Sequence, residues 1–457
     1  MRTIAGIYKA YDIRGIVDKE LDADLAYWIG RAFVRVTRTA GTTVCVGKDM
    51  RPSSVPYAAA LIEGMLDEGA SVMDAGLVST PLFYFATRDY AAGVMVTASH
   101  NPKEYNGFKF CRERAIPVSY DTGIREIERL VGELRAEKPA PNGKGTIGTH
   151  DFLGEFLDEN LCRLRTRKPM TIVVDAANGM GGLEYAALAQ RLAARTPGPI
   201  RILPLYFDLD GSFPNHEANP LKEETLVELQ RRVKAENGAT LGLALDGDGD
   251  RCVFLDERGE VIRADLFLAL IAQELLKTRT GGTVLHDLRS SRIVAETIRA
   301  AGGKPVMCRV GHAYIKAQMR EEHALLAGEL SGHFYPGEAN YTENTMYALF
   351  AILNLLEATD KPLSELVAPL QKYAFSGEIN SKVADADATL AAAEKRYAAL
   401  PGIRDLSHLD GVRIEYATWW FSLRKSNTEP VVRLIVEADT QQEMETRRDE
   451  LLGLIRS

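Results

Sequence analysis

Short apolar runs alternate with amphipathic stretches through most of this 457-residue chain. Residues 43–47, 71–76 and 92–97 have the length and composition of buried strands, whereas residues 56–66 carry the spacing of apolar positions that is typical of a helix. An alternation of strands and helices predicts a sheet with helices packed on its faces. The first part of the chain is therefore expected to be an α/β domain.

The same alternation continues after a stretch rich in Pro, Gly and Lys at residues 138–145, which has the composition of a linker. Strands are predicted at residues 171–175, 239–245 and 282–285, and an apolar helix is predicted at residues 265–276. Three β/α units of similar size are therefore expected, an arrangement compatible with structural repeats although no strict sequence period is visible.

The last part of the chain has a different pattern. An alanine-rich helix at residues 386–400 is followed by strand-like segments at 411–416, 419–423 and 431–436 and by a closing helix. This order predicts an α+β domain with an antiparallel sheet. The fold class is thus α/β, with three topologically similar mixed domains and a C-terminal α+β domain around a central cleft. The predicted domains are residues 1–145, 146–255, 256–365 and 366–457.

Composition narrows the functional classes. A chain of 457 residues is too long for one ordinary core, and 46% hydrophobic with 26% charged residues is typical of a globular domain protein. The net charge of −8 argues against a nucleic-acid-binding protein, which would usually be basic. No apolar segment has the length of a membrane span, and the N-terminal residues lack the apolar core of a signal peptide.

The five cysteines are scattered, odd in number and without CxxC spacing. This pattern predicts neither a disulfide framework nor a zinc site, and it favours a reducing, cytoplasmic location.

The segment Thr97-Ala98-Ser99-His100-Asn101-Pro102 follows directly after a buried strand. A serine at a strand end is held by its neighbours and can react. Lys109, which follows in the sequence, adds a positive charge to the same region. The combination suggests a serine that handles an anion such as phosphate. The alternative is an ordinary strand and turn followed by an Asn-Gly hairpin loop at residues 106–107.

The segment Asp246-Gly247-Asp248-Gly249-Asp250-Arg251 presents three carboxylates at alternate positions. Such carboxylates can converge on one hard divalent cation, and magnesium prefers oxygen ligands of this kind. A calcium-binding EF-hand loop is disfavoured because its sixth position needs glycine, whereas this chain has Arg251, and because the flanking segments are predicted to be strands. A solvated acidic turn is the other alternative.

Two further loops carry polar chemistry. Gly328-Glu329-Leu330-Ser331-Gly332-His333 offers a carboxylate, a hydroxyl and an imidazole that suit a sugar and an anion. Arg424-Lys425-Ser426-Asn427-Thr428-Glu429-Pro430 offers cations and hydroxyls that suit a phosphate. Taken alone, the first segment is more typical of an ordinary Gly-rich loop, and the second is also compatible with a charged surface hairpin turn.

With these four loops in view, the chain resembles the α-D-phosphohexomutase superfamily. The motifs TASHNP, DGDGDR, GELSGH and RKSNTEP occur in the family's order and with similar separations over nearly the whole chain. The resemblance implies three similar α/β domains plus a C-terminal α+β domain, and a phosphomannomutase or phosphoglucomutase activity, which is an isomerase reaction.

The resemblance also implies a role for each matched residue. Ser99 is expected to carry the phosphoryl group, and Asp246, Asp248 and Asp250 to bind Mg²⁺ together with a phosphate oxygen on Ser99. Glu329 and Ser331 are expected to contact sugar hydroxyls. The predicted phosphate-binding residues are Arg424, Ser426, Asn427 and Thr428. Further active-site positions are expected at Tyr11, Arg14, His100, Lys109, Arg251 and His333, and substrate contacts with looser motif support at Arg289 and His312.

The implied reaction converts a hexose 1-phosphate and a hexose 6-phosphate into one another through a hexose 1,6-bisphosphate that reorients in the site. Ser331 favours mannose and glucose phosphates, because enzymes for acetylglucosamine usually have asparagine at this position, and the sequence does not fix which is preferred. A phosphoglucosamine mutase, a metal-dependent phosphatase and a non-catalytic sugar-phosphate binding protein remain alternatives. The expected partner is the hexose phosphate alone, with no nucleic acid or membrane, and the chain is expected to be a monomer or homodimer.

Overall fold

The chain forms two compact units, which are described separately. The first contains residues 1–263 and 331–364, and the second contains residues 264–330 and 365–457. The computed structural model describes residues 6–194, 199–425 and 431–456.

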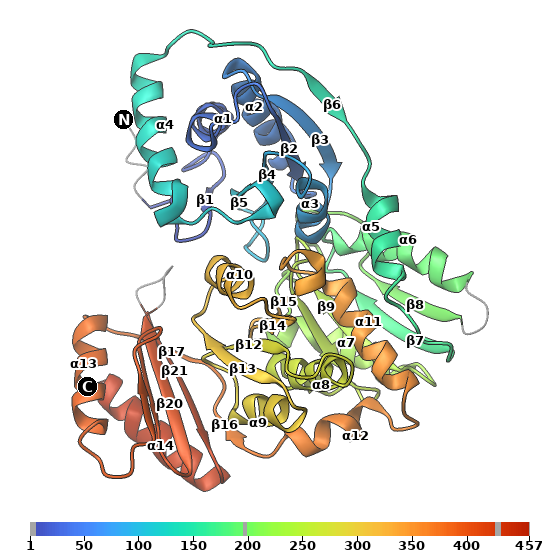
Figure 1. Cartoon of the computed structure of the whole chain (residues 1–457), viewed down its shortest axis with the longest axis vertical. Helices are drawn as coiled ribbons and strands as arrows, with labels where there is room; N and C mark the ends of the chain where they lie inside the picture. The colour runs from blue at the N-terminus through green and yellow to red at the C-terminus, as the bar shows by residue number, and fades with distance from the viewer. Residues whose placement is uncertain (1–5, 195–198, 426–430, 457) are drawn as a thin grey trace. The chain divides into compact units, whose positions relative to one another are not determined.

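The first sheet lies in the N-terminal part of the first unit (Figure 1). Its strand order is β1-β5-β4-β2-β3-β6, in which β2 is parallel to β3 and β4, and β5 is antiparallel to both β4 and β1. The elements are β1 (Ile13–Ile16), α1 (Ala23–Thr37), β2 (Thr43–Lys48), α2 (Ser54–Asp67), β3 (Ser71–Leu77), α3 (Thr80–Thr87), β4 (Ala92–Val96), β5 (Tyr105–Arg112), α4 (Arg125–Glu137) and β6 (Ile147–Thr149).

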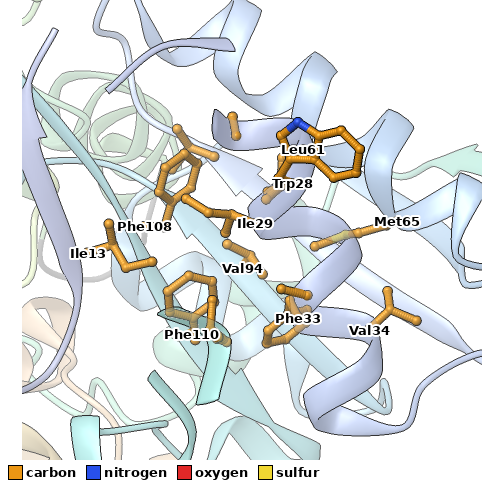
Figure 2. Packing of buried hydrophobic residues seen from close by; sticks show 14 of the residues in the cluster. Ile13, Trp28, Ile29, Phe33, Val34, Leu61, Met65, Val94, Phe108 and Phe110 are labelled. Carbon is orange, nitrogen blue, oxygen red and sulfur yellow. The ribbon is translucent and has the colours of Figure 1, made fainter. Parts of the chain in front are cut away.

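An apolar core between this sheet and helices α1, α2 and α4 decides which side chains face the other side of the sheet. Phe108 and Phe110 of β5 pack in this core with Ile29 and Phe33 of α1 (Figure 2). Because successive side chains of a strand point to opposite faces, Lys109 between the two phenylalanines must point away from this core. The alternation of side chains along β5 thus places Lys109 on the opposite face of the sheet.

The second sheet also lies in the first unit. Its order is β11-β10-β9-β7-β8, with β7 parallel to β8 and β9 and with β10 antiparallel to β9. The elements of this part are α5 (Leu153–Leu161), β7 (Met170–Asp175), α6 (Gly181–Ala193), β8 (Ile200–Leu205), α7 (Glu223–Ala235), β9 (Leu241–Leu245), β10 (Cys252–Leu255) and β11 (Val261–Ile262), followed later in the chain by β15 (Phe334–Pro336) and α11 (Thr345–Glu357).

The second unit begins with a short parallel sheet. The strands of this sheet that belong to the second unit have the order β13-β12-β14, with β12 parallel to both neighbours. The elements are α8 (Ala264–Leu276), β12 (Thr283–Asp287), α9 (Arg292–Ala300), β13 (Lys304–Cys308), α10 (His312–Glu321) and β14 (Leu326–Gly328).

The second unit ends with an antiparallel sheet in the order β16-β21-β20-β19-β18, and β17 also pairs with β21. Apolar side chains of this sheet pack with residues of the last two helices in one core. The elements are α12 (Leu363–Val367), β16 (Ala374–Phe375), β17 (Ile379–Lys382), α13 (Ala386–Tyr397), β18 (Asp405–Ser407), β19 (Val412–Glu415), β20 (Trp419–Lys425), β21 (Val431–Ala438) and α14 (Gln441–Ile455).

The first three sheets share one arrangement. In each sheet a central strand (β2, β7 or β12) is parallel to the next strand along the chain on one side and to the third strand on the other. The loops that begin at Thr97, Asp246 and Glu329 each follow the third strand, namely β4, β9 or β14. The fold class of three similar α/β domains and a different C-terminal α+β domain is confirmed, whereas the exact domain boundaries stay a prediction.

Most predicted strands and helices are confirmed to within a few residues. The alternative of an Asn-Gly hairpin loop is wrong, because Asn106 and Gly107 lie inside β5, paired with Gly15 and Arg14 of β1. Among the described residues, no helix has both the length and the apolar character needed to cross a membrane.

Candidate active site

Ser99 has an unusual backbone conformation at the end of β4. Its φ angle is 51°, in the left-handed region that non-glycine residues seldom occupy, and its side chain is buried. The Ser99 backbone N–H donates to Thr97 Oγ1 at 2.9 Å, and the Ser99 hydroxyl donates to Asp246 Oδ2 at 2.8 Å. His100 Nδ1 lies 3.1 Å from the same hydroxyl. The hydroxyl of Ser99 is therefore fixed between a carboxylate and an imidazole.

The acidic loop connects β9 and β10, two buried antiparallel strands. Asp246, Asp248 and Asp250 are almost completely buried, with exposed fractions of 0%, 0% and 3%. One carboxylate oxygen from each lies within 4.8 Å of the others. The alternative of a solvated acidic turn is therefore wrong, and the EF-hand alternative is wrong because strands rather than helices flank the loop.

The glycines of this loop permit a close approach to Ser99. A Cβ atom on Gly247 would lie 2.5 Å from the Ser99 carbonyl oxygen, and Gly249 has a φ angle of 73°. The alternating Asp and Gly residues thus have two roles. The aspartates bring three carboxylates together, and Gly247 lets the loop lie against Ser99.

Lys109 supplies positive charge to the three carboxylates. Its Nζ lies 2.7 Å from Asp248 Oδ2 and 2.6 Å from Asp250 Oδ2. Burial alone would lower the pKa of this ammonium, but the two carboxylates outweigh burial and raise its pKa. Lys109 therefore stays charged and cancels part of the negative charge of the loop.

The remaining negative charge gives the loop the properties of a cation site. Burial raises the pKa of the Asp246 carboxyl well above its usual range, and the neighbouring Asp250 and Asp248 raise it further. Asp248 Oδ1 is buried without a hydrogen-bond partner in the described structure, and Asp250 Oδ1 is buried with His333 Nε2 3.3 Å away. Buried acceptors of this kind normally have a partner. Three carboxylates within reach of one another, with Asp248 Oδ1 unsatisfied, fit a hard divalent cation.

The histidines and Arg251 lie beside this cluster. Burial lowers the pKa of His100 well below its usual range, and the nearby Arg251 and Arg14 lower it further, so this imidazole is neutral. His333 Nε2 lies 3.3 Å from both Arg251 Nε and Asp250 Oδ1. Ser331 Oγ lies 3.0 Å from His333 Nδ1 and so connects the end of the GELSGH segment to the same group.

Two further predicted residues lie near the start of the chain. Arg14 is in β1 and donates to Asn101 Oδ1, in the loop of Ser99, at 2.7 Å and to Asp12 Oδ2 at 2.5 Å. Tyr11 lies in the turn just before β1 and is partly exposed.

Sequence reasoning missed Thr80, at the beginning of α3. Its hydroxyl donates to Asp248 Oδ2 at 2.6 Å, and its backbone N–H donates to the Asp248 carbonyl at 2.8 Å. Ser79 followed by Thr80 and Pro81 is a clear helix start, with Ser79 accepting from Leu82 N as the N-cap. That signal predicts the helix but not its contact with a residue 168 positions away.

A second group of predicted residues lies in the second unit. Arg289 Nη2 lies 2.6 Å from Asp287 Oδ2 and 3.5 Å from Glu329 Oε2. Burial alone would lower the pKa of Arg289, but Asp287, Glu378 and Glu329 outweigh it and raise the pKa. The buried Glu329 carboxylate is thus held beside a permanently charged guanidinium.

Arg424 contacts Glu378, which the sequence did not single out. Arg424 Nη2 lies 2.9 Å from Glu378 Oε2, and Arg433 Nη1 lies 3.0 Å from Glu378 Oε1. Burial alone would raise the pKa of Glu378, but Arg289 and Arg424 outweigh burial, and the pKa falls to about 2. Three arginines therefore gather around one carboxylate, an arrangement that can also attract a phosphate.

The sequence also predicts substrate-binding residues at His312, Ser426, Asn427 and Thr428 in this unit. His312 is the first residue of α10, after Gly311 with a φ angle of 126°. Ser426, Asn427 and Thr428 lie outside the described residues.

Four models of one family match the chain in succession. They are those of the phosphoglucomutase/phosphomannomutase alpha/beta/alpha domains I, II and III and of the C-terminal domain. The residues matched are 6–138, 151–259, 263–373 and 378–454.

Comparison with whole proteins indicates the same family. The chain is 37% identical to a phosphomannomutase of Escherichia coli over 98% of this chain and 99% of that protein. It is 37% identical to a phosphomannomutase/phosphoglucomutase of Pseudomonas aeruginosa, over 96% of this chain and 93% of that protein. A crystal structure of a phosphoglucomutase/phosphomannomutase family protein from Burkholderia thailandensis has a TM-score of 0.90 and 32% identity, covering 100% of this chain and 98% of that one. The chain therefore belongs to the phosphoglucomutase/phosphomannomutase family, a family of phosphohexomutases within the isomerases.

Proposed function

We propose that this enzyme interconverts the 1-phosphate and the 6-phosphate of mannose, glucose or both, with Ser99 as the residue that carries the phosphoryl group. One observation carries the proposal: the buried Ser99 hydroxyl contacts Asp246 at 2.8 Å, and Asp246 belongs to a cluster of three buried carboxylates with a lysine at its edge. A serine in an ordinary loop would not be placed against such a cluster.

The reaction begins with phosphorylated Ser99. A sugar hydroxyl attacks the phosphorus atom and forms a new O–P bond, while the bond between phosphorus and Ser99 Oγ breaks. The hydroxyl proton passes to a neighbouring base, and the serine oxygen receives a proton. The hexose 1,6-bisphosphate then turns over, and the Ser99 hydroxyl attacks the phosphorus atom of the other phosphate. The bond between this phosphorus and the sugar oxygen breaks, the sugar oxygen receives a proton, and the phosphoryl group returns to Ser99 while the hexose leaves as the other monophosphate.

Positive groups around Ser99 would stabilise the charge that spreads over the transferring oxygens. Lys109, Arg14 and Arg251 supply this charge in the first unit. His100 is neutral and lies 3.1 Å from the hydroxyl, so it can accept the serine proton when Ser99 attacks. Asp246, Asp248 and Asp250 would hold Mg²⁺, which when bound would add positive charge beside the phosphoryl group.

The second unit has side chains suited to a sugar and to a phosphate. Glu329 is buried beside Arg289 and would accept hydrogen bonds from sugar hydroxyls, while Arg424 would bind the phosphate that is not being transferred. Mannose and glucose phosphates are proposed because the relatives are named phosphomannomutase and phosphomannomutase/phosphoglucomutase.

The test is the conversion of glucose 1-phosphate to glucose 6-phosphate in a coupled assay with Mg²⁺ and a glucose 1,6-bisphosphate activator, and of mannose 1-phosphate in parallel. S99A should lose activity by about 10³-fold or more, because removal of a covalent group disables the chemical step, while it still binds substrate. S422A is a matched control, because Ser422 is equally buried and belongs to β20.

Other outcomes identify the alternatives. Binding without turnover in the native enzyme would indicate a sugar-phosphate binding protein, and release of inorganic phosphate would indicate a phosphatase. Preferred turnover of glucosamine phosphate would indicate a phosphoglucosamine mutase. Full activity of S99A, with no other residue phosphorylated, would refute the proposed role of Ser99.

A further inference from the structure

Arg51 is a buried arginine in the turn between β2 and α2, with an exposed fraction of 1%. Its backbone N–H donates to Asp49 Oδ1 at 3.0 Å, and its Nε lies 3.3 Å from Asp49 Oδ2. Asp49 is itself completely buried. The charge of Arg51 is therefore balanced within its own turn, and the ends of its guanidinium are available for other contacts.

The terminal nitrogens of the Arg51 guanidinium, Nη1 and Nη2, both donate to the loop of Ser99. Arg51 Nη2 donates to the carbonyls of Ser99 at 2.8 Å and Asn101 at 2.6 Å, and Nη1 donates to the carbonyls of Pro102 at 2.9 Å and Tyr105 at 3.1 Å. A guanidinium has four N–H bonds on its two terminal nitrogens, so all four are used on backbone carbonyls of residues 99–105. No side chain of this loop takes part.

The loop between β8 and α7 also packs against Arg51. The Phe213 ring centre lies 5.0 Å from Arg51 Cζ, and a Cβ atom on Gly211 would lie 2.6 Å from Arg51 Cα. Without Arg51, the four carbonyls would lose these donors, and the buried Ser99 carbonyl would lose its bond to Nη2, which costs about 1–3 kcal/mol if no other donor replaces it.

The first of these carbonyls belongs to the residue with the strained backbone. A left-handed conformation costs a non-glycine residue about 1–3 kcal/mol and persists only where the surroundings impose it. Thr97 holds the N–H of Ser99 and Arg51 holds its carbonyl oxygen, so both peptide groups of the residue are fixed. The direction of the Ser99 side chain toward Asp246 follows from these two constraints.

We propose that Arg51 is a positioning residue for phosphoryl transfer, which keeps Ser99 in its left-handed conformation by binding four carbonyls of the loop. The inference rests on the proposed role of Ser99. Arg51 touches neither substrate nor the reacting atoms in this role. It acts through the peptide backbone, and lysine cannot replace it fully because an ammonium lacks the planar fork that reaches several carbonyls at once.

Arg31 provides a matched control in the same part of the chain. It is also fully buried, pairs with Glu68 at 2.8 Å, and donates to the carbonyls of Pro139 at 2.7 Å and Ala140 at 3.1 Å. These carbonyls lie in a segment that carries none of the candidate site residues. Replacing Arg31 should cost stability as replacing Arg51 does, without moving Ser99.

The experiment compares R51M and R51K with R31M and R31K in the full-length enzyme. Steady-state assays with glucose 1-phosphate give kcat and KM, and hydrogen–deuterium exchange is followed in the peptides that cover residues 97–107 and 137–143. R51M should lower kcat by about 100-fold with KM changed by less than about threefold, since a displacement near 1 Å can have this effect on the chemical step. R51K should recover part of the loss.

Hydrogen–deuterium exchange should rise only in the segment whose carbonyl groups lose their arginine donors. R51M should accelerate exchange in residues 97–107 and not in 137–143, and R31M should do the reverse. If R51M does not fold, R51K supports the same comparison, because it keeps the charge beside Asp49.

The inference is overturned if the Arg51 variants keep kcat within about threefold of the native enzyme, if only KM changes, or if the Arg31 variants lose kcat equally. The hydrogen–deuterium exchange measurement does not depend on whether Ser99 carries the phosphoryl group, so it tests Arg51 separately from the proposed function. If S99A stays active, the proposed function fails even when Arg51 protects the loop; if S99A is inactive and R51M keeps its kcat, only the role of Arg51 fails.

Discussion

Replacing Gly247 with alanine should separate the acidic loop from Ser99. The added Cβ would lie 2.5 Å from the Ser99 carbonyl oxygen and 3.5 Å from Ala218 Cβ. The φ angle of Gly247 is not in the left-handed region, so alanine can adopt this backbone, and the contact with Ser99 is the main perturbation. The variant thus tests whether the contact between the two loops matters.

The size of the effect follows from the distance. An ordinary contact begins at 3.4 Å, so the two loops must move apart by about 0.9 Å. Overpacking of this kind costs about 1–3 kcal/mol of stability. A misplacement near 1 Å at the reacting groups costs about 100-fold in rate, so G247A should lower kcat by about 100-fold.

The assay is the coupled phosphoglucomutase reaction, with urea unfolding measured in parallel. G132A is a suitable control, because Gly132 is exposed in α4 with nothing within 4 Å of an added Cβ. Alanine there should stabilise the helix by about 0.5–1 kcal/mol and leave kcat unchanged. If folded G247A keeps kcat within about threefold of the native enzyme, the contact between Gly247 and Ser99 is not part of the working site.

Three further changes test charges elsewhere. K109M removes the ammonium from between Asp248 and Asp250 and should lower the free energy of unfolding by about 3–5 kcal/mol, with partial recovery in Mg²⁺; urea unfolding that matches the native enzyme would contradict this. Burial raises the pKa of Glu184 to about 7 from 4.5, so the folded state holds its proton longer and stability is lost as pH rises from about 4.5 to 7. E184Q should therefore gain about 2–3 kcal/mol relative to the native enzyme between pH 5 and pH 8, and a difference that does not change with pH would be the opposite result. E378Q removes the negative charge that Arg289, Arg424 and Arg433 surround, so inorganic phosphate should raise Tm more in the variant than in the native enzyme, and equal shifts would count against an anion site there.

The sequence predicts much of the site because local rules decide what each loop contains. Lys109 lies between two core phenylalanines of a strand, and the period of two sends it to the opposite face. The alternating aspartates and glycines after an apolar strand predict a cluster of carboxylates that can bind a cation, whether or not the partner loop is known. These features depend on a few neighbouring residues and on strand geometry.

Contacts between distant segments could not be predicted in this way. Thr80 reaches Asp248 across 168 positions, and Arg51 reaches Ser99 across 48. Each looks like a helix start or a turn residue in the sequence, because the pattern gives the local element and not the loop that packs against it. Glu378 was missed for the same reason, since only the folded sheet brings it to Arg424.

The shared strand order explains how the loop of Ser99 and the loop of Asp246 come to lie at equivalent places in their sheets. Ser99 follows the third strand of the first sheet, and Asp246 follows the third strand of the second. Each loop therefore begins at the carboxyl end of a strand in a parallel pair, where open α/β sheets usually bind ligands. The Ser99 carbonyl receives Arg51 from its own domain and contacts Gly247 of the next. Because both act on one peptide group, the direction of the Ser99 hydroxyl depends on the packing of two sheets and not on the sequence of its own loop alone.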